Sequence, residues 1–132
     1  MNVLRSVAAV VAGYLVFALS AVLLFQLSGV DPHARQSLPF MLGTVIYGMA
    51  FASLGGVVAM RIAPLRPTLH AAILAGVIEL GAVVSLIASP GAGTSWSQWS
   101  ALVLMAPCAF LVPRVIVDRR AAPFDAEDSH RR

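Results

Sequence analysis

Four long apolar blocks, separated by short polar segments, make up most of the chain. They cover residues 7–27, 40–60, 69–88 and 97–117. A helix rises about 1.5 Å per residue, so about 20 residues cross the roughly 30 Å hydrocarbon core of a bilayer. The pattern therefore predicts an all-α polytopic membrane protein, in which residues 1–117 form one domain of four transmembrane helices.

The composition agrees with a membrane location. Of the 132 residues, 59% are hydrophobic and 11% are charged, and the mean hydropathy is +0.87, whereas soluble proteins carry about 25% charged residues. The expected partner is thus the lipid bilayer. All nine basic residues are Arg, and most lie at block ends or near the C-terminus rather than on one helical face. The net charge of +3 therefore does not indicate a nucleic-acid partner.

The first block also allows a second interpretation, as a cleaved signal peptide. Ala18-Leu19-Ser20 before Ala21 resembles a small-residue cleavage site. The apolar run continues through residues 22–25, which makes it longer than the apolar region of most signal peptides. We expect a retained membrane span, with cleavage as the alternative.

The distribution of arginine predicts the orientation of the chain. Four spans place both termini on one side of the membrane, and the loops on the other side contain only Arg35. The side of the termini holds Arg5, Arg61, Arg66, Arg114, Arg119 and Arg120. The positive-inside rule then predicts four antiparallel helices in a bacterial inner membrane, with both termini and the loop at residues 64–67 in the cytoplasm.

A stripe of small residues marks the second block. Thr44, Gly48, Ala52 and Gly56 recur every four residues and so share one helical face. Small residues let two membrane helices approach closely, and close packing is a main source of helix association in lipid. The stripe predicts a helix-packing face, and we expect Gly76 in the third block to take part in packing as well.

The fourth block begins with Trp96 and Trp99, which we interpret as anchors at the membrane interface, with ligand stacking as the alternative. Pro107 and Pro113 lie inside the block, where each removes a backbone donor and is expected to kink the helix. The segment that follows, residues 118–132, is mixed in charge and poor in apolar residues. It is expected to be a disordered cytoplasmic tail.

Glu79 is the only acidic residue inside the four apolar blocks, and it lies at the centre of the third. An ionisable side chain at the bilayer centre costs about 2.5–3.5 kcal/mol on insertion scales, so such residues normally face protein or water. The helical neighbours of Glu79 are all small and favour close packing: Ala72, Ala75, Gly76 and Ala82.

Candidate hydrogen-bond partners for Glu79 can be chosen by their depth in the membrane. Tyr14 and Ser53 are expected about one turn toward the cytoplasm, and Tyr47 and Ser20 about one turn toward the outside. Two hypotheses stay open for this intramembrane polar site. Glu79 either clamps helices together through hydrogen bonds, or it binds and releases a proton or cation.

The sequence offers little support for catalysis. His70 lies at the predicted cytoplasmic start of its helix, His33 in an outer loop and His130 in the tail, so the three are not expected to converge on a metal, and there is one cysteine. The serines lack a base and an orienting group, and no phosphate-binding glycine loop occurs. We therefore expect no enzymatic activity and no cofactor. The expected function is assembly with itself or with a membrane partner; the alternative is an oligomeric proton- or cation-coupled transporter of small molecules that uses Glu79.

Overall fold

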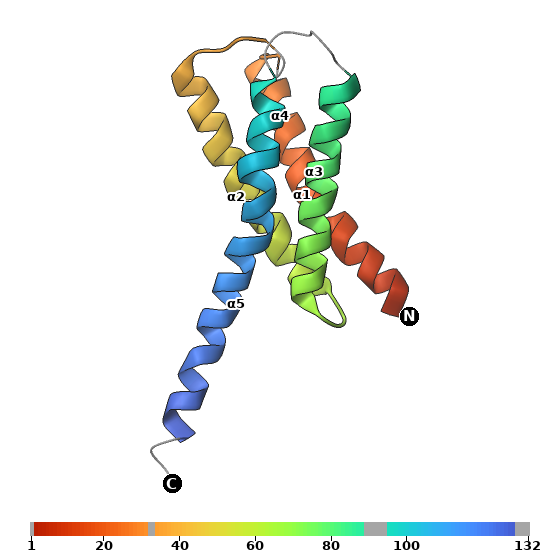
Figure 1. Cartoon of the computed structure of the whole chain (residues 1–132), viewed down its shortest axis with the longest axis vertical. Helices are drawn as coiled ribbons and strands as arrows, with labels where there is room; N and C mark the ends of the chain where they lie inside the picture. The colour runs from red at the N-terminus through yellow and green to blue at the C-terminus, as the bar shows by residue number, and fades with distance from the viewer. Residues whose placement is uncertain (1, 32–33, 89–94, 129–132) are drawn as a thin grey trace.

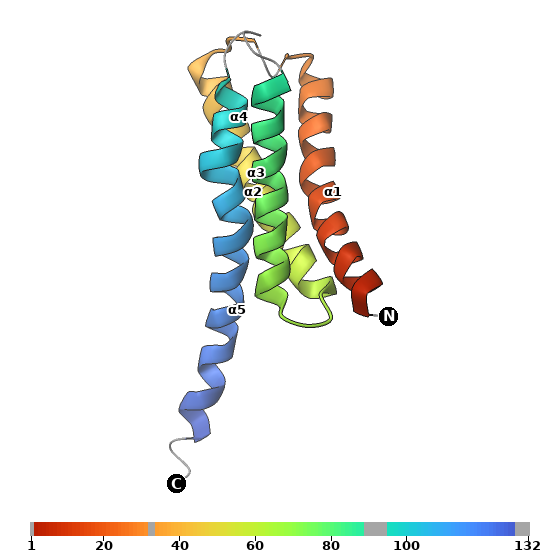
Figure 2. The same ribbon diagram turned by 45° about the vertical axis from the view of Figure 1, so that its right-hand side comes forward.

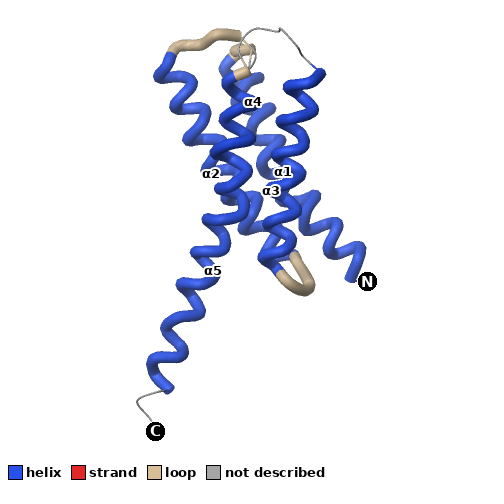
Figure 3. Tube along the Cα trace, in the orientation of Figure 1, coloured by secondary structure: helices blue, strands red, loops and turns tan. Residues whose placement is uncertain are grey.

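The computed structural model describes residues 2–31, 34–88 and 95–128. Within these ranges all regular structure is helical (Figures 1 and 3). In chain order the helices are α1 (Asn2–Ser28), α2 (Leu38–Ile62), α3 (Pro67–Ala88), α4 (Trp96–Ser100), the π-helical segment η1 (Ala101–Met105) and α5 (Ala106–Asp128).

Four helical stretches in the described part of the chain are long and apolar enough to cross a membrane. They are Val3–Ser28, Leu38–Ile62, Pro67–Ala88 and Trp96–Arg119. The last of these combines α4, η1 and the first part of α5. The prediction of four such helices is therefore confirmed, with bounds that differ from the predicted ones by a few residues.

The two ends of the molecule are each held by a hydrogen bond between distant parts of the chain. Figures 1 and 2 place both termini and the α2–α3 connection at one end, and the start of α2 and the start of α4 at the other, which we call the distal end. Near the termini, Arg5 Nε donates to the carbonyl of Ile62 at 2.9 Å. At the distal end, Trp96 Nε1 donates to the carbonyl of Ala34 at 3.3 Å.

The core lies where α2, α3, η1 and α5 meet, and it consists mostly of small side chains. Its buried members are Ala52, Ala59, Leu74, Ala75, Ile78, Met105, Ala106 and Ala109. Helix α1 packs against α2 and α3 but, in the described part of the chain, does not reach α4, η1 or α5. The alanines permit close contact between backbones, which favours helix association in lipid.

The two prolines of the fourth span affect it differently. Pro107 lies two residues after the end of η1, and the N–H of Ala106 between them donates to the carbonyl of Ala101, five residues earlier. This π-helical turn widens the helix next to a residue that has no N–H to donate. Pro113, which was also expected to kink the helix, lies within the continuous helix α5 and is fully buried.

Helix α5 extends into the segment for which the sequence predicts a disordered tail. Helix α5 continues beyond residue 117 as far as Asp128, and residues 129–132 lie outside the described residues. The extension adds turns to a helix that is already formed, so it avoids the cost of helix nucleation. Its Arg119-Arg120-Ala121-Ala122 sequence also consists of strong helix formers.

Candidate functional site

Glu79 lies on the exposed surface of α3. It makes no hydrogen bond or ion pair within the part of the chain that the structure describes. Ala72, Gly76 and Val83 are exposed too, and their spacing places them on the same face of α3 as Glu79. Gly76, which we expected in a helix contact, has no neighbour within 4 Å of the position a Cβ would occupy. We call Ala72, Gly76, Glu79 and Val83 together the Glu79 face.

The other polar residues predicted for the intramembrane site point elsewhere. Tyr47 Oη donates to the carbonyl of Ser20 on α1 at 3.3 Å. Ser53 Oγ donates within α2 and, over 3.4 Å, to the carbonyl of Cys108 on α5. Within one chain, Glu79 therefore does not share a site with them. The reason is helical geometry: a residue next to core-facing Ile78 is turned by about 100° away from it.

The small residues of α2 lie in the contact with the fourth span. Gly48, Ala52 and Gly56 are buried. A Cβ on Gly48 would collide with the side chain of Met105 in η1, and one on Gly56 would collide with the backbone of Ala109 in α5. Each glycine therefore allows a contact that a larger side chain would block.

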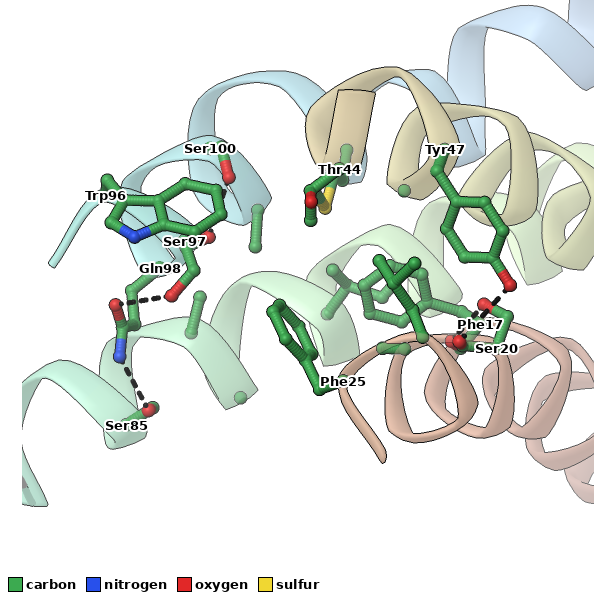
Figure 4. Close-up of a pocket in the computed structure, with 18 of the residues that line it drawn as sticks. Phe17, Ser20, Phe25, Thr44, Tyr47, Ser85, Trp96, Ser97, Gln98 and Ser100 are labelled. Carbon is green, nitrogen blue, oxygen red and sulfur yellow. Dashed lines mark hydrogen bonds between the residues drawn. The ribbon is translucent and has the colours of Figure 1, made fainter. Parts of the chain in front are cut away.

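A cavity of about 290 Å³ lies between α1, α2, α3 and the start of the fourth span (Figure 4). It occupies the distal half, where α1 does not reach α4 or η1. Aromatic rings form much of its wall: Phe17, Phe25, Tyr47 and Trp96. Tyr14 lines it as well, and so faces this cavity rather than Glu79, which is not among the lining residues.

Polar side chains gather on the wall formed by α3 and α4. Gln98 is buried, with 7% of its surface exposed. Its amide Nε2 donates to Ser85 Oγ at 3.4 Å, and its Oε1 accepts a bond from Ser97 Oγ at 3.0 Å (Figure 4). This network joins the end of α3 to α4. Sequence reasoning did not single out Gln98, because a lone amide between two tryptophans carries no helical pattern.

The two tryptophans of α4 occupy different environments. Trp99 is 57% exposed, as an anchor at the membrane interface would be. Trp96 is half-buried, lines the cavity and hydrogen-bonds Ala34. Its role in the wall of the cavity was not visible in the sequence, since both residues fit the same interfacial pattern.

The remaining reactive side chains do not converge. Among the described residues there is no group of three or more His, Cys, Asp or Glu side chains that could hold a metal ion. His70 is buried and its Nδ1 lies 3.2 Å from the carbonyl of Arg66, within the first turn of α3. Cys108 is a free, half-buried thiol.

Comparison with known proteins yields no matching family model, no similar curated protein and no similar solved structure. Two features of this chain are therefore candidates for a functional role. One is the Glu79 face on the outside of α3, and the other is the cavity in the distal half.

Proposed function

We propose that the protein is a multi-pass protein of a bacterial inner membrane, with four antiparallel spans and both termini in the cytoplasm. The arginine asymmetry supports this orientation, because it places all of the nine arginines except Arg35 on the proposed cytoplasmic side. The bond between Arg5 and Ile62 supports the antiparallel arrangement of the first two spans, since it joins the start of the first span to the end of the second.

We further propose that the protein has no enzymatic activity and that it assembles with a second copy of itself through the Glu79 face. One observation carries this proposal: a carboxyl group lies exposed in the middle of an apolar helix, with no hydrogen-bond partner among the described residues. In lipid this arrangement is costly, and intramembrane acids normally face protein or water.

The residues around Glu79 suit a helix–helix contact. Positions 72, 76, 79 and 83 are separated by four, three and four residues, which is the spacing of a continuous seam along a helix. Ala72 and Gly76 are small enough to let a second helix approach closely. Glu79 would then leave lipid and enter a protein interface.

A second copy is the partner whose chemistry fits best. In a two-fold dimer the same surface is used by both subunits, so each Glu79 meets the other at the same depth in the membrane. The neutral form of a carboxyl group has one O–H donor and one carbonyl acceptor. Two copies of Glu79 can therefore satisfy each other reciprocally, whereas a different protein would have to supply a polar group at that depth.

Cysteine cross-linking in lipid bilayers tests the assembly. In a Cys108→Ala background, Val83→Cys places a thiol on the Glu79 face, and we expect it to cross-link between subunits. Val84→Cys is the matched control, because it lies one residue away at the same depth and is 55% exposed on a different side of α3. Cross-linking that is equally efficient at both positions would contradict the proposed interface.

The contribution of the carboxyl group is measured in the same assay. Glu79→Gln keeps a donor and an acceptor and should preserve the Val83→Cys cross-link, whereas Glu79→Leu removes both and should weaken it. If neither variant changes cross-linking, the carboxyl group does not hold the dimer. If Val83→Cys cross-links only to another membrane protein, the partner is not a second copy.

The same exposed carboxyl group favours one alternative function. An oligomer could surround Glu79 with water rather than with protein. Such an oligomer would act as a proton- or cation-coupled transporter of small molecules, with Glu79 as the group that ionises. A group that ionises during transport cannot be replaced by Gln, which has no acidic proton. Measurement of proton and cation flux in liposomes separates this alternative from assembly alone.

A further inference from the structure

Along α3 and the fourth span, the lining of the cavity changes from polar to apolar. At the distal end it includes side chains of the last turn of α3 and of α4, among them Ser85, Gln98 and Ser100. Toward the middle of the bundle these helices contribute Ile78 and Met105. On α1 and α2 the hydroxyl groups of Ser20 and Tyr47 also line the cavity, and each donates to a backbone carbonyl of the protein.

One buried polar group in this wall lacks a partner. The side chain of Thr44 on α2 is only 7% exposed. Its hydroxyl makes no hydrogen bond within the described part of the chain, and Figure 4 shows it facing the space between α4 and Phe25. Buried hydroxyl groups nearly always have a hydrogen-bond partner. Because Thr44 lines the cavity, that partner can be supplied by a molecule bound inside it.

The lining restricts the chemistry and the size of such a molecule. Among the described residues that line the cavity there is no Asp, Glu, Lys or Arg, so none of them would neutralise a charged ligand. Aromatic rings on α1, α2 and α4 offer flat apolar surfaces. At about 30 Å³ for a water-sized group, the cavity of about 290 Å³ holds about ten non-hydrogen atoms.

The cavity also reaches the surface of the helix bundle. Tyr14 on α1 and Gly81 on α3 line it, and both are exposed. This opening lies between two of the proposed membrane spans and therefore faces lipid. A molecule dissolved in the membrane could enter from the side.

We propose that the cavity binds a small, uncharged amphipathic molecule taken from the membrane. Its hydroxyl or carbonyl group bonds to the hydroxyl of Thr44 at the distal end, and its apolar body packs against the aromatic wall and Met105. This site is independent of the Glu79 face, because Glu79 does not line the cavity.

Quenching of Trp96 fluorescence by 4-bromophenol tests the proposal, since bromine quenches an indole ring that it contacts. A Trp99→Phe background leaves Trp96 as the one tryptophan of the chain. We expect quenching that saturates with probe concentration. Ala21→Phe, which fills the cavity from α1, should abolish the saturable part. Leu23→Phe, at a position that is 56% exposed and outside the lining, should not.

The hydrogen bond is tested by Thr44→Val, which keeps the shape of the side chain and removes its hydroxyl. Affinity for 4-bromophenol should fall about two- to tenfold, the range for one neutral hydrogen bond, while affinity for bromobenzene should be unchanged. Thr68→Val, at an exposed position on α3, should change neither. If Ala21→Phe does not fold, the comparison of Thr44→Val with Thr68→Val still tests the proposal, because both substitutions keep the shape of the side chain.

Three results would overturn the proposal. The first is quenching that rises linearly with probe concentration and is the same in Ala21→Phe, which would indicate partition into lipid. The second is a Thr44→Val variant that binds 4-bromophenol as the wild type does. The third is quenching of Trp96 by phospholipids with brominated acyl chains that Ala21→Phe removes, because a lipid chain rather than a small molecule would then fill the cavity.

Discussion

Gly13 on α1 and Gly55 on α2 face each other backbone to backbone. A Cβ on Gly13 would lie 2.6 Å from the carbonyl oxygen of Gly55, and a Cβ on Gly55 would lie 2.5 Å from that of Gly13. Real Cβ atoms do not approach other heavy atoms so closely, so only glycine fits at either position. Helix α2 thus presents Gly55 to α1 and the neighbouring Gly56 to α5.

Replacing Gly13 by Ala should destabilise the protein. The added methyl group meets the backbone of α2, which cannot move aside as a flexible side chain would, and overpacking of this kind costs about 1–3 kcal/mol. Thermal unfolding in detergent, followed by circular dichroism, should show a lower melting temperature.

Gly43→Ala is the matched control for this substitution. Gly43 is also within a membrane-spanning helix, but a Cβ there would have no neighbour within 4 Å. Alanine favours a helix over glycine by up to about 1 kcal/mol, so the melting temperature should be unchanged or higher. Equal melting temperatures for Gly13→Ala and Gly43→Ala would show that α1 and α2 are not in close contact.

Gly56→Leu should destabilise the fold of the single chain, whereas Gly76→Leu should weaken the proposed dimer. Gly56 faces the backbone of Ala109 and the ring of Pro113, so leucine there should separate α2 from α5 and lower the melting temperature of the single chain. Gly76 is exposed on α3, so leucine there should leave folding intact and weaken only the proposed dimer. If Gly56→Leu had the melting temperature of the wild type, this would contradict the contact between α2 and α5.

The proposed orientation predicts the outcome of reporter fusions. Reporters fused after Ser28 and after Gly93 should be found outside the cytoplasm, whereas reporters fused after Pro64 and after Arg120 should be found within it. A cytoplasmic signal from the fusion after Gly93 would be incompatible with four spans of this orientation.

Flux measurements in liposomes separate assembly from transport. If Glu79 serves only assembly, vesicles containing the wild type should show no proton or cation flux under a panel of gradients, and Glu79→Gln should assemble normally. Wild-type flux that disappears in a folded Glu79→Gln variant would instead establish transport, because the amide has no acidic proton to exchange.

The packing of α2 was predictable only in part. A four-residue spacing of small side chains is a local pattern, and it indicated the face that contains Gly48 and Gly56. The contact between Gly13 and Gly55 joins glycines on two different helices, and no local spacing marks it. Gly55 and Gly56 therefore contact two different helices, α1 and α5, and these contacts are seen only in the packed structure.

The direction in which Glu79 points could not be predicted from the sequence either. Glu79 stood out because it is the one acid among four apolar blocks, and small neighbours suggested that it faces another helix. Which side of α3 faces the core depends on the positions of Leu74, Ala75 and Ile78 relative to α2 and α5. In an apolar helix nearly every side could be buried or could face lipid, so the hydrophobic pattern does not reveal the direction of Glu79.

Four helices able to cross a membrane could be predicted from the sequence, because length and hydropathy are properties of each segment alone. In contrast, the exposed position of Glu79 outside the packed core, and the place of Thr44 and Trp96 in the wall of one cavity, are seen only in the packed structure. These placements depend on how helices from distant parts of the chain rotate and approach one another. In lipid that choice follows from close packing and hydrogen bonding, which act between segments and leave no periodic pattern within any one of them.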